Sequence, residues 1–225
     1  MHIRSFFISF ALVPALSSGL FSTTFANGAG SQAEVPQGPT ACAFSAWTND
    51  DKASIEVRAA PSGDSKLVGH IPTVSTDQEA EYAYSISFDV LETQDGWLKI
   101  ANASDAYNEE SDDYVPRTVY KGEGWIKSDA AKVGIQSARG FLKPDPESER
   151  LLDIGSDWLT DMGRINNILA CHENWVLIDY TVLRKRMPGE ELVELASNEQ
   201  LTGRAWFRGL CSNAETTCDM KSVDQ

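Results

Sequence analysis

The residue types that could carry catalysis come together at one place in the chain. Cys171 and His172 would combine a thiol nucleophile with a general base. Adjacent residues on a strand point to opposite faces, so the two side chains cannot form that pair directly. The sequence also holds no G-x-S-x-G, H-E-x-x-H or phosphate-loop motif. We therefore predict a protein that is not an enzyme and that needs no cofactor.

Two groups of residues could instead bind a metal ion. One is the acidic set Glu109, Glu110, Asp112 and Asp113. It lacks the spaced acids and glycine of a dedicated calcium loop, and a solvated acidic loop explains it better. The other group is the cysteines, but no C-x-x-C pair exists and only His70 and His172 follow residue 26. We predict no metal site.

The first residues indicate export. Arg4 precedes an apolar, uncharged stretch over residues 5–21, and small residues follow it. This order is typical of a secretory signal peptide over residues 1–26, cut after Ala26, with Ala29 as the second choice. A membrane anchor fits less well, because Pro14 and several serines interrupt a run already short for a bilayer. We predict an extracytoplasmic protein, periplasmic or secreted.

Composition fits an exported protein with an acidic surface. The formal charge of the 225 residues is −14, and it becomes −15 without Arg4. This charge argues against nucleic acid and anionic membrane as partners. Four cysteines, all beyond the cut, suit two disulfides in an oxidising compartment. Residues 27–40 are small, polar and proline-containing, and they predict a flexible leader.

Two tryptophan signatures occur twice at nearly one spacing. TQDGWLKIA (93–101) has a later analogue in ENWVLIDY (173–180), which places Trp97 and Trp175 78 positions apart. GEGWI (122–126) is matched by GRAWF (203–207), 81 positions apart at the tryptophan. In the first pair, apolar residues follow the tryptophan with the two-residue period of a strand. In the second pair, a glycine stands three residues before each tryptophan. The spacing predicts two copies of one all-β unit.

The first copy resembles the bacterial SH3 (SH3b) family. The opening IEVRAAPSGDSKLVGHIP (55–72), the strands of 88–101 and the segment GEGWIKSDAAKVG (122–134) correspond to the family's motifs in order. The resemblance implies a small, strongly bent barrel of antiparallel strands. It also implies an extracytoplasmic, non-catalytic module. Many members bind peptidoglycan or its peptides, whereas others have no known ligand.

From the repeat and the resemblance we predict an all-β protein of two small SH3-like barrels in tandem, with little helix. The first domain spans residues 41–134, the second, diverged one spans 135–220, and 221–225 form a tail. The second opening, ARGFLKPDPESERLLDI (138–154), lacks the V-R-x-x-P-S motif. SDWLTDMGR in the second copy suggests a helical turn, and Pro188-Gly189 before two glutamates suggests a hairpin tip.

Two further segments stand out from the strand pattern. Residues 102–121 are too long for a tight hairpin and predict a protruding loop, or a loop with a short extra ribbon. LRKRM (183–187) is a local basic cluster in an acidic protein. It could pair with an acidic partner, although such runs are usually a solvated face.

Aromatic side chains are the candidate binding residues. Trp97 and Trp175 lie on the strand face opposite their apolar neighbours, where an indole could stack on a sugar or anchor a peptide. The alternative is that these rings only cover the end of a small barrel, which needs large side chains to exclude water. The candidates are Trp97, Trp125, Trp175, Trp206, Tyr107 and Tyr114.

Two classes of function follow. The first is a non-catalytic binding protein of the cell envelope that recognises cell-wall peptide, glycan or an envelope protein. The second is a periplasmic inhibitor or immunity-type protein that blocks an enzyme through its acidic surface and long loop. The SH3b motifs favour the first, whereas the charge and the loop favour the second.

The family fold also suggests a disulfide pairing, because it makes the Trp175 and Trp206 strands antiparallel neighbours. In the register carried over from the first copy, Leu177 opposes Ala205, and the same ladder brings Cys171 opposite Cys211. Cys42 and Cys218 would then form the other bridge. The alternative pairs Cys211 with Cys218 and Cys42 with Cys171, and a one-residue slip of the register would favour it.

Overall fold

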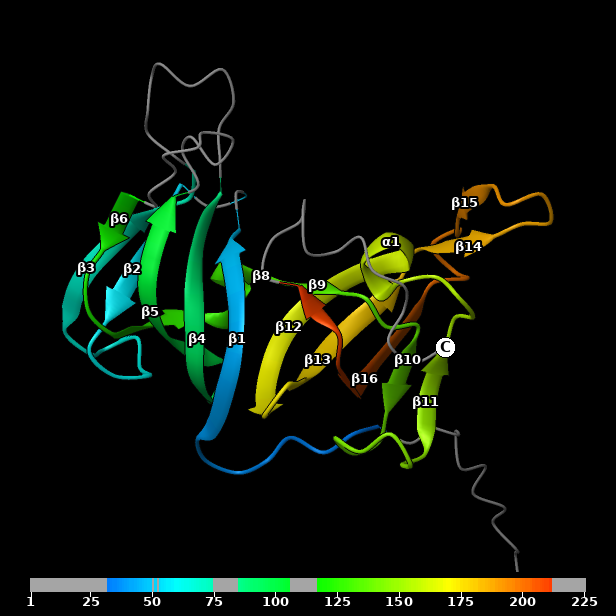
Figure 1. Cartoon of the computed structure of the whole chain (residues 1–225), viewed down its shortest axis with the longest axis horizontal. Helices are drawn as coiled ribbons and strands as arrows, with labels where there is room; N and C mark the ends of the chain where they lie inside the picture. Colours follow the sequence, from blue (N-terminus) through cyan, green and yellow to red (C-terminus); the bar gives the residue numbers. More distant parts are fainter. Residues whose placement is uncertain (1–31, 50, 52, 75–84, 106–116, 212–225) are drawn as a thin grey trace, which may run out of the picture.

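The computed structural model describes residues 32–211 except residues 50, 52, 75–84 and 106–116. The chain is mostly β-strand in antiparallel sheets, with one short α-helix, which confirms the expectation of an all-β protein with little helix (Figure 1). No closed barrel is found in the described part of the chain. The expected signal peptide, Tyr107, Tyr114, Cys218 and the tail lie outside the described residues.

The first sheet is built from the first half of the chain. Its strands follow the order β3-β2-β7-β5-β4-β1-β8, and β6 pairs with β5. A single 3-10 turn, η1 (Ser128–Ala130), links β7 to β8. The strands are β1 (Thr40–Thr48), β2 (Ser54–Arg58), β3 (Leu67–Pro72), β4 (Ile86–Gln94), β5 (Trp97–Asp105), β6 (Arg117–Tyr120), β7 (Gly124–Lys127) and β8 (Ala131–Lys132).

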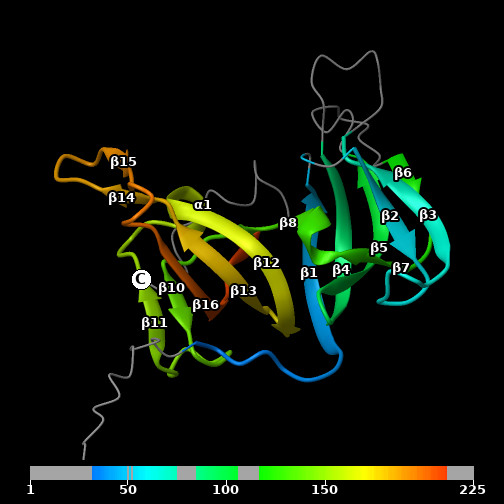
Figure 2. The ribbon, with the colours of Figure 1, turned by 180° about the vertical axis from the view of Figure 1, so that it is seen from behind.

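The second sheet is built from the second half, in the order β11-β10-β16-β13-β12. The helical turn expected before β12 is present as α1 (Leu159–Met162). The hairpin expected at Pro188-Gly189 is the β14–β15 ribbon, which projects from one end of the molecule (Figure 2). The strands of this sheet are β10 (Arg139–Phe141), β11 (Arg150–Asp153), β12 (Gly163–His172), β13 (Trp175–Val182) and β16 (Leu201–Phe207). Two separate two-stranded sheets pair β14 (Arg184–Arg186) with β15 (Leu192–Glu194) and β9 (Gly134–Ile135) with β17 (Leu210–Cys211).

The β4–β5 and β12–β13 hairpins share one register. Gln94 pairs with Trp97 in the first hairpin, and His172 pairs with Trp175 in the second. Each hairpin also carries a bulge at the same place, Leu91 in β4 and Leu169 in β12, 78 positions later. A bulge adds one unpaired residue to one strand, so its recurrence at one position supports a true internal repeat.

The remaining strands repeat in the same way. Trp125 of β7 pairs with Lys99, and Trp206 of β16 pairs with Leu177. The β2–β3 hairpin corresponds to β10–β11, 83 positions later, and the two turns have matching hydrogen bonds. The backbone N–H of Ala59 donates to the Lys66 carbonyl at 2.9 Å, as Leu142 does to Glu149 at 2.8 Å. The second opening therefore keeps the backbone of the first without its motif.

The register differs by one residue from the sequence expectation, and the disulfide differs with it. Leu177 opposes Trp206 rather than Ala205, so the expected Cys171–Cys211 bridge is wrong. Cys171 instead bonds Cys42, with 5.1 Å between their Cα atoms, which also removes the expected Cys42–Cys218 bridge. Cys211 is disulfide-bonded too, and Cys218 lies outside the described residues.

Strand β1 joins the two units (Figure 1). It pairs with β4 and lies against β12, to which its Cys42 is bonded. The Thr40 hydroxyl lies 2.6 Å from that of Thr93 and accepts a hydrogen bond from the Cys171 N–H at 3.0 Å. Thr93 and Cys171 hold equivalent places in the repeat. Strand β1 therefore contacts the two copies at corresponding points.

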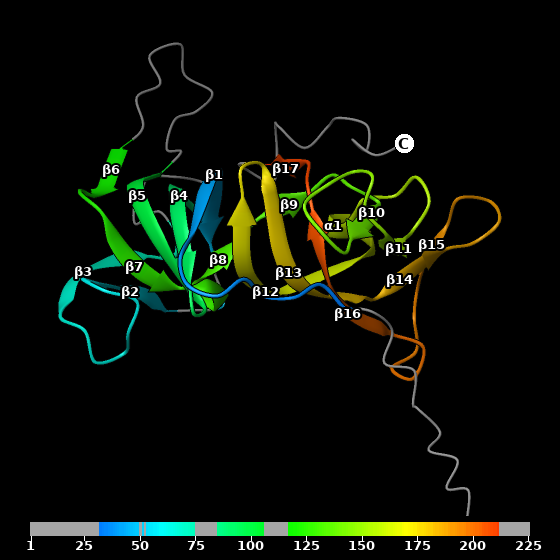
Figure 3. The same ribbon diagram turned by 90° about the horizontal axis from the view of Figure 1, so that it is seen from below.

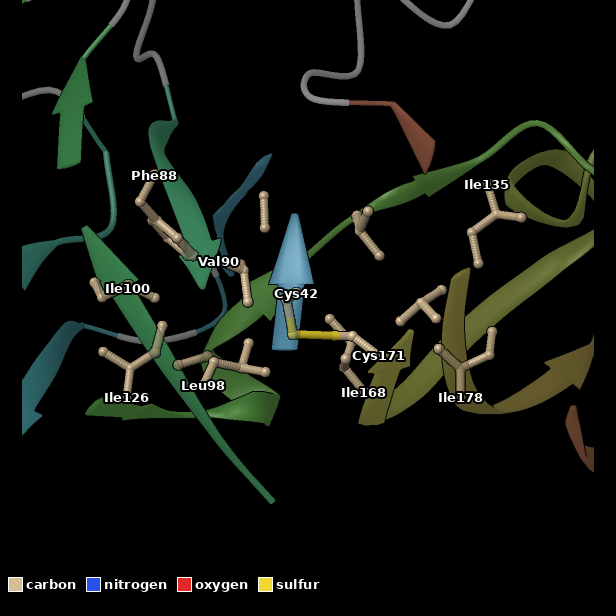
Figure 4. Close-up of a cluster of buried hydrophobic side chains, with 14 of the residues drawn as sticks. Cys42, Phe88, Val90, Leu98, Ile100, Ile126, Ile135, Ile168, Cys171 and Ile178 are labelled. Carbon is tan, nitrogen blue, oxygen red and sulfur yellow. A yellow bond between two sulfur atoms is a disulfide. The ribbon is translucent and has the colours of Figure 1, made fainter. Parts of the chain in front are cut away.

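One hydrophobic core extends through both units. Figure 4 shows Val90, Leu98 and Ile100 on one side of the Cys42–Cys171 bridge and Ile168 and Ile178 on the other. All five are 0 or 1% exposed. The sheets therefore form a single packed body in which the disulfide is part of the core. No helix of the described residues is both long and apolar enough to cross a membrane.

Candidate binding surfaces

The four candidate tryptophans are largely buried. Trp97 and Trp125 are 9% and 8% exposed, and Trp175 and Trp206 are 5% and 4% exposed. They share the outer face of each sheet, opposite the core positions such as Leu98. Burial of this degree favours the packing interpretation for most of each ring. Trp97 and Trp206 also border cavities.

In the second unit the outer face is an apolar cluster. Phe141 contacts Trp175 edge to face, with 5.4 Å between ring centroids. Residues 32–39, here called the strap, run along this unit from β1 (Figure 3). The strap contributes Ala33, which is 2% exposed. The cluster consists of Ala33, Phe141, Ala170, Trp175, Leu177 and Trp206.

The strap is the described part of the segment expected to be a flexible leader. The Ala33 N–H donates to the Arg204 carbonyl at 3.2 Å, next to the apolar cluster. The burial of Ala33 could not be predicted from the sequence, because alanine is as common in flexible leaders as in buried positions. The segment is therefore held to the second unit at Ala33.

In the first unit the equivalent face is charged. Arg58 takes the place of Phe141, Lys99 that of Leu177 and Glu92 that of Ala170. The Lys99 ammonium lies 2.6 Å from the Glu123 carboxylate, and this hydrogen bond raises the pKa of Lys99 above its ordinary value. Arg58 pairs with Glu56. Long side chains of this kind can lay their aliphatic stems on apolar surface while their charged heads reach water.

Both units place a cation over the first tryptophan. The Lys127 ammonium lies 5.9 Å from the centre of the Trp97 ring, and the Arg208 guanidinium lies 5.4 Å from that of Trp175. Lys127 is the residue paired with Trp97 across β5 and β7. Arg208, 81 positions later, holds the equivalent place. A cation over an indole is attracted by the ring quadrupole.

A groove of about 360 Å³ opens beside Trp97. It is within the size range of small-molecule sites. Its wall combines the indole with two cations, Arg58 and Lys127, and two carboxylates, Glu56 and Asp129. An aromatic surface between charges of both signs can hold a ligand that carries an amine, a carboxylate and an apolar group.

Sequence reasoning identified Trp97 but missed the charged residues around it. In the sequence, Arg58 stood out only as part of the V-R motif. The cation over Trp97 could have been found from the repeat, because Lys127 and Arg208 each follow a matched tryptophan by two residues. Trp125 and Trp175 do not line the groove. In the segment expected as a loop over 102–121, residues 102–105 belong to β5 and pair with β6 as a short ribbon, and 106–116 lie outside the described residues. The basic cluster of 183–187 is exposed on β14, where the Arg186 guanidinium lies 2.9 Å from Asp157.

Among the described residues, no group of three or more His, Cys, Asp or Glu is arranged to hold a metal ion.

Comparisons with protein-family models, with curated proteins and with solved structures find no match for this chain.

Proposed function

We propose that the protein is a non-catalytic, exported binding protein of the cell envelope that holds a cell-wall peptide in the groove beside Trp97. We also propose that each unit is a variant of the SH3b barrel. The observation that carries the function is the groove itself. It is lined by the Trp97 indole, by the cations Arg58 and Lys127, and by the carboxylates Glu56 and Asp129.

The chemistry of the groove suits a short peptide better than an uncharged glycan. Cell-wall peptides carry free amines and carboxylates, and the groove offers a counter-charge for each. The Trp97 ring supplies an apolar surface for a side chain or for an aliphatic stem. The exposed surroundings limit each ion pair to about 1 kcal/mol or less, so specificity depends on several such contacts together.

The first unit is the better candidate of the two. Its outer face is charged, and the strap, which contributes Ala33 to the cluster on the second unit, does not line the groove.

Binding to purified peptidoglycan, and calorimetric titration with a free stem peptide, test the proposal. We expect Lys127→Gln and Glu56→Gln each to weaken binding by about threefold to fivefold, the share of one exposed ion pair. Arg208→Gln changes the equivalent cation in the second unit and serves as the matched control. Equal weakening by all three variants, or no binding by the parent protein, contradicts the proposal.

The inhibitor or immunity-type function stays as a second candidate because of the charge. A formal charge of −14 over 225 residues suits an encounter with a basic enzyme. Pulldown from lysate, compared with pulldown on peptidoglycan, separates the two. Retention of one basic enzyme that is lost at high salt, without retention on peptidoglycan, would favour the inhibitor.

A further inference from the structure

The strap is held at its two ends and stands free between them. At one end Ala33 is buried and donates its N–H to Arg204. At the other end the Thr40 hydroxyl contacts Thr93 and the Cys171 N–H. Every residue from 34 to 39 is exposed. The strap therefore forms an arch rather than a strand packed along its whole length.

A cavity of about 920 Å³ lies between this arch and the second unit. Its lining comes from both sides, with Val35 and Pro36 from the strap and Leu142, Pro144 and Trp206 from the sheet and the β10–β11 turn. This volume is near the upper end of the range for ligand sites. The apolar lining on two sides favours a ligand with an apolar side chain, since such a group would be removed from water on both faces.

Polar and charged groups also line the cavity. The second unit contributes Lys143 and the His172 imidazole, and the strap contributes Glu34. Within the part of the chain that the structure describes, neither Lys143 nor Glu34 has an ion-pair partner. A cation and a carboxylate on facing walls are complementary to the two termini of a free peptide.

We propose that this cavity is a second binding site, which takes a short zwitterionic peptide with an apolar side chain. The side chain lies against Trp206, the carboxylate lies near Lys143 and the amine lies near Glu34. Ala33 shows that this face already holds extended backbone, by one small side chain and one main-chain hydrogen bond. The site is separate from the groove beside Trp97 and does not depend on it.

Titration with the tripeptide Ala-Leu-Ala, followed by amide and indole NMR signals of the full chain, tests the site. We expect saturable shifts at the Trp206 indole N–H and at the strap amides. Amidation of the peptide carboxylate should weaken binding by about threefold to fivefold, and Lys143→Gln should do the same. Amidation of the peptide should not weaken its binding to the Lys143→Gln variant any further, because both changes remove the same ion pair.

Two controls separate this site from other effects. Lys66→Gln removes an exposed lysine from the β2–β3 turn of the first unit and should leave the shifts unchanged. Lys127→Gln alters the Trp97 groove and should also leave them unchanged. Shifts confined to Trp97, absence of saturable shifts at Trp206 and the strap, or equal binding of the amidated and free peptides would each overturn the proposal.

Discussion

The two units share a strand register but present opposite outer faces. Core positions correspond in type, as with Leu98 and Val176 or Ile100 and Ile178, and all four are 0% exposed. On the other face, Arg58 in the first unit corresponds to Phe141 in the second. The first face carries charged side chains such as Arg58 and Lys99, whereas the second face receives Ala33 of the strap. The shared core thus sets the pairing, while the outer face is free to specialise.

The cores also show how the repeat conserves volume. In the first unit Val57 packs over Gly124, where an added Cβ would lie 2.3 Å from the valine. In the second unit the small residue has changed strands, since Gly140 replaces Val57 and Ala205 replaces Gly124. An added Cβ on Gly140 would lie 2.7 Å from that of Ala205. Each pair keeps one glycine at the close approach of the two strands.

The largest expected effect comes from the outer-face pair. Phe141 is 1% exposed and contacts Trp175, so Phe141→Ala should lower the free energy of unfolding by about 3–5 kcal/mol. Arg58→Ala, at the equivalent place, should cost about 1 kcal/mol, because it loses an exposed ion pair and some packing. Urea unfolding measures both. Equal losses of stability would contradict the view that the outer face is an apolar core in the second unit and a charged surface in the first.

The bridge between the units should have the next largest effect. Cys42 and Cys171 are 129 residues apart, and removing a disulfide that closes so long a loop should cost about 2–5 kcal/mol. We expect the paired change Cys42→Ala with Cys171→Ala to show this loss in the unfolding midpoint. Unchanged stability would mean that β1 holds the units together without the bond.

Exchange of the small residue gives a directional test. Gly140→Val should destabilise by about 1–3 kcal/mol, because the new side chain meets Ala205 and Phe207. Adding Ala205→Gly and Phe207→Ile recreates the first unit's set, Val57, Gly124 and Ile126. We expect this triple variant to recover part of the loss in thermal unfolding. A triple variant less stable than Gly140→Val alone would contradict the equivalence of the units.

Release of the strap should be the smallest effect. Ala33→Asp would bury a carboxylate in the apolar cluster, and detachment of the strap limits the cost to about 1 kcal/mol. We expect faster hydrogen exchange at the residue 33 amide. Glu34→Asp, at the exposed neighbouring position, is the matched control. An unchanged hydrogen-exchange rate at residue 33 would show that burial of Ala33 in the apolar cluster does not hold the strap.

How far the sequence predicts this structure depends on the kind of feature. The repeat could be predicted, because Trp97 and Trp175 are followed by the same apolar period and the second tryptophan pair keeps nearly the same spacing. The register was one residue off, since tryptophan spacing places strands as neighbours but does not fix which residues face each other. The cysteine pairing was also wrong because the ladder between β13 and β16 ends at Phe207, and Cys211 lies on β17, which pairs with β9. A one-residue shift is enough to change every cross-strand contact.

The candidate surfaces could be predicted only in part. Trp97 was a candidate from the sequence, and it borders the groove. Arg58 comes from β2, whereas Lys127 and Asp129 come from the end of β7 and from η1, and no local pattern relates Arg58 to the other two. The strap was expected to be free because its composition is that of a linker. One buried alanine and a single hydrogen bond, both set by tertiary contacts, hold it in place.

The central claim is that the two units pair their strands in one register. Cross-strand nuclear Overhauser contacts at two equivalent places test it most directly. We expect Lys99 to face Trp125 in the first unit and Leu177 to face Trp206 in the second. Contacts of Leu177 with Ala205 in place of Trp206, together with Lys99 facing Trp125, would contradict it.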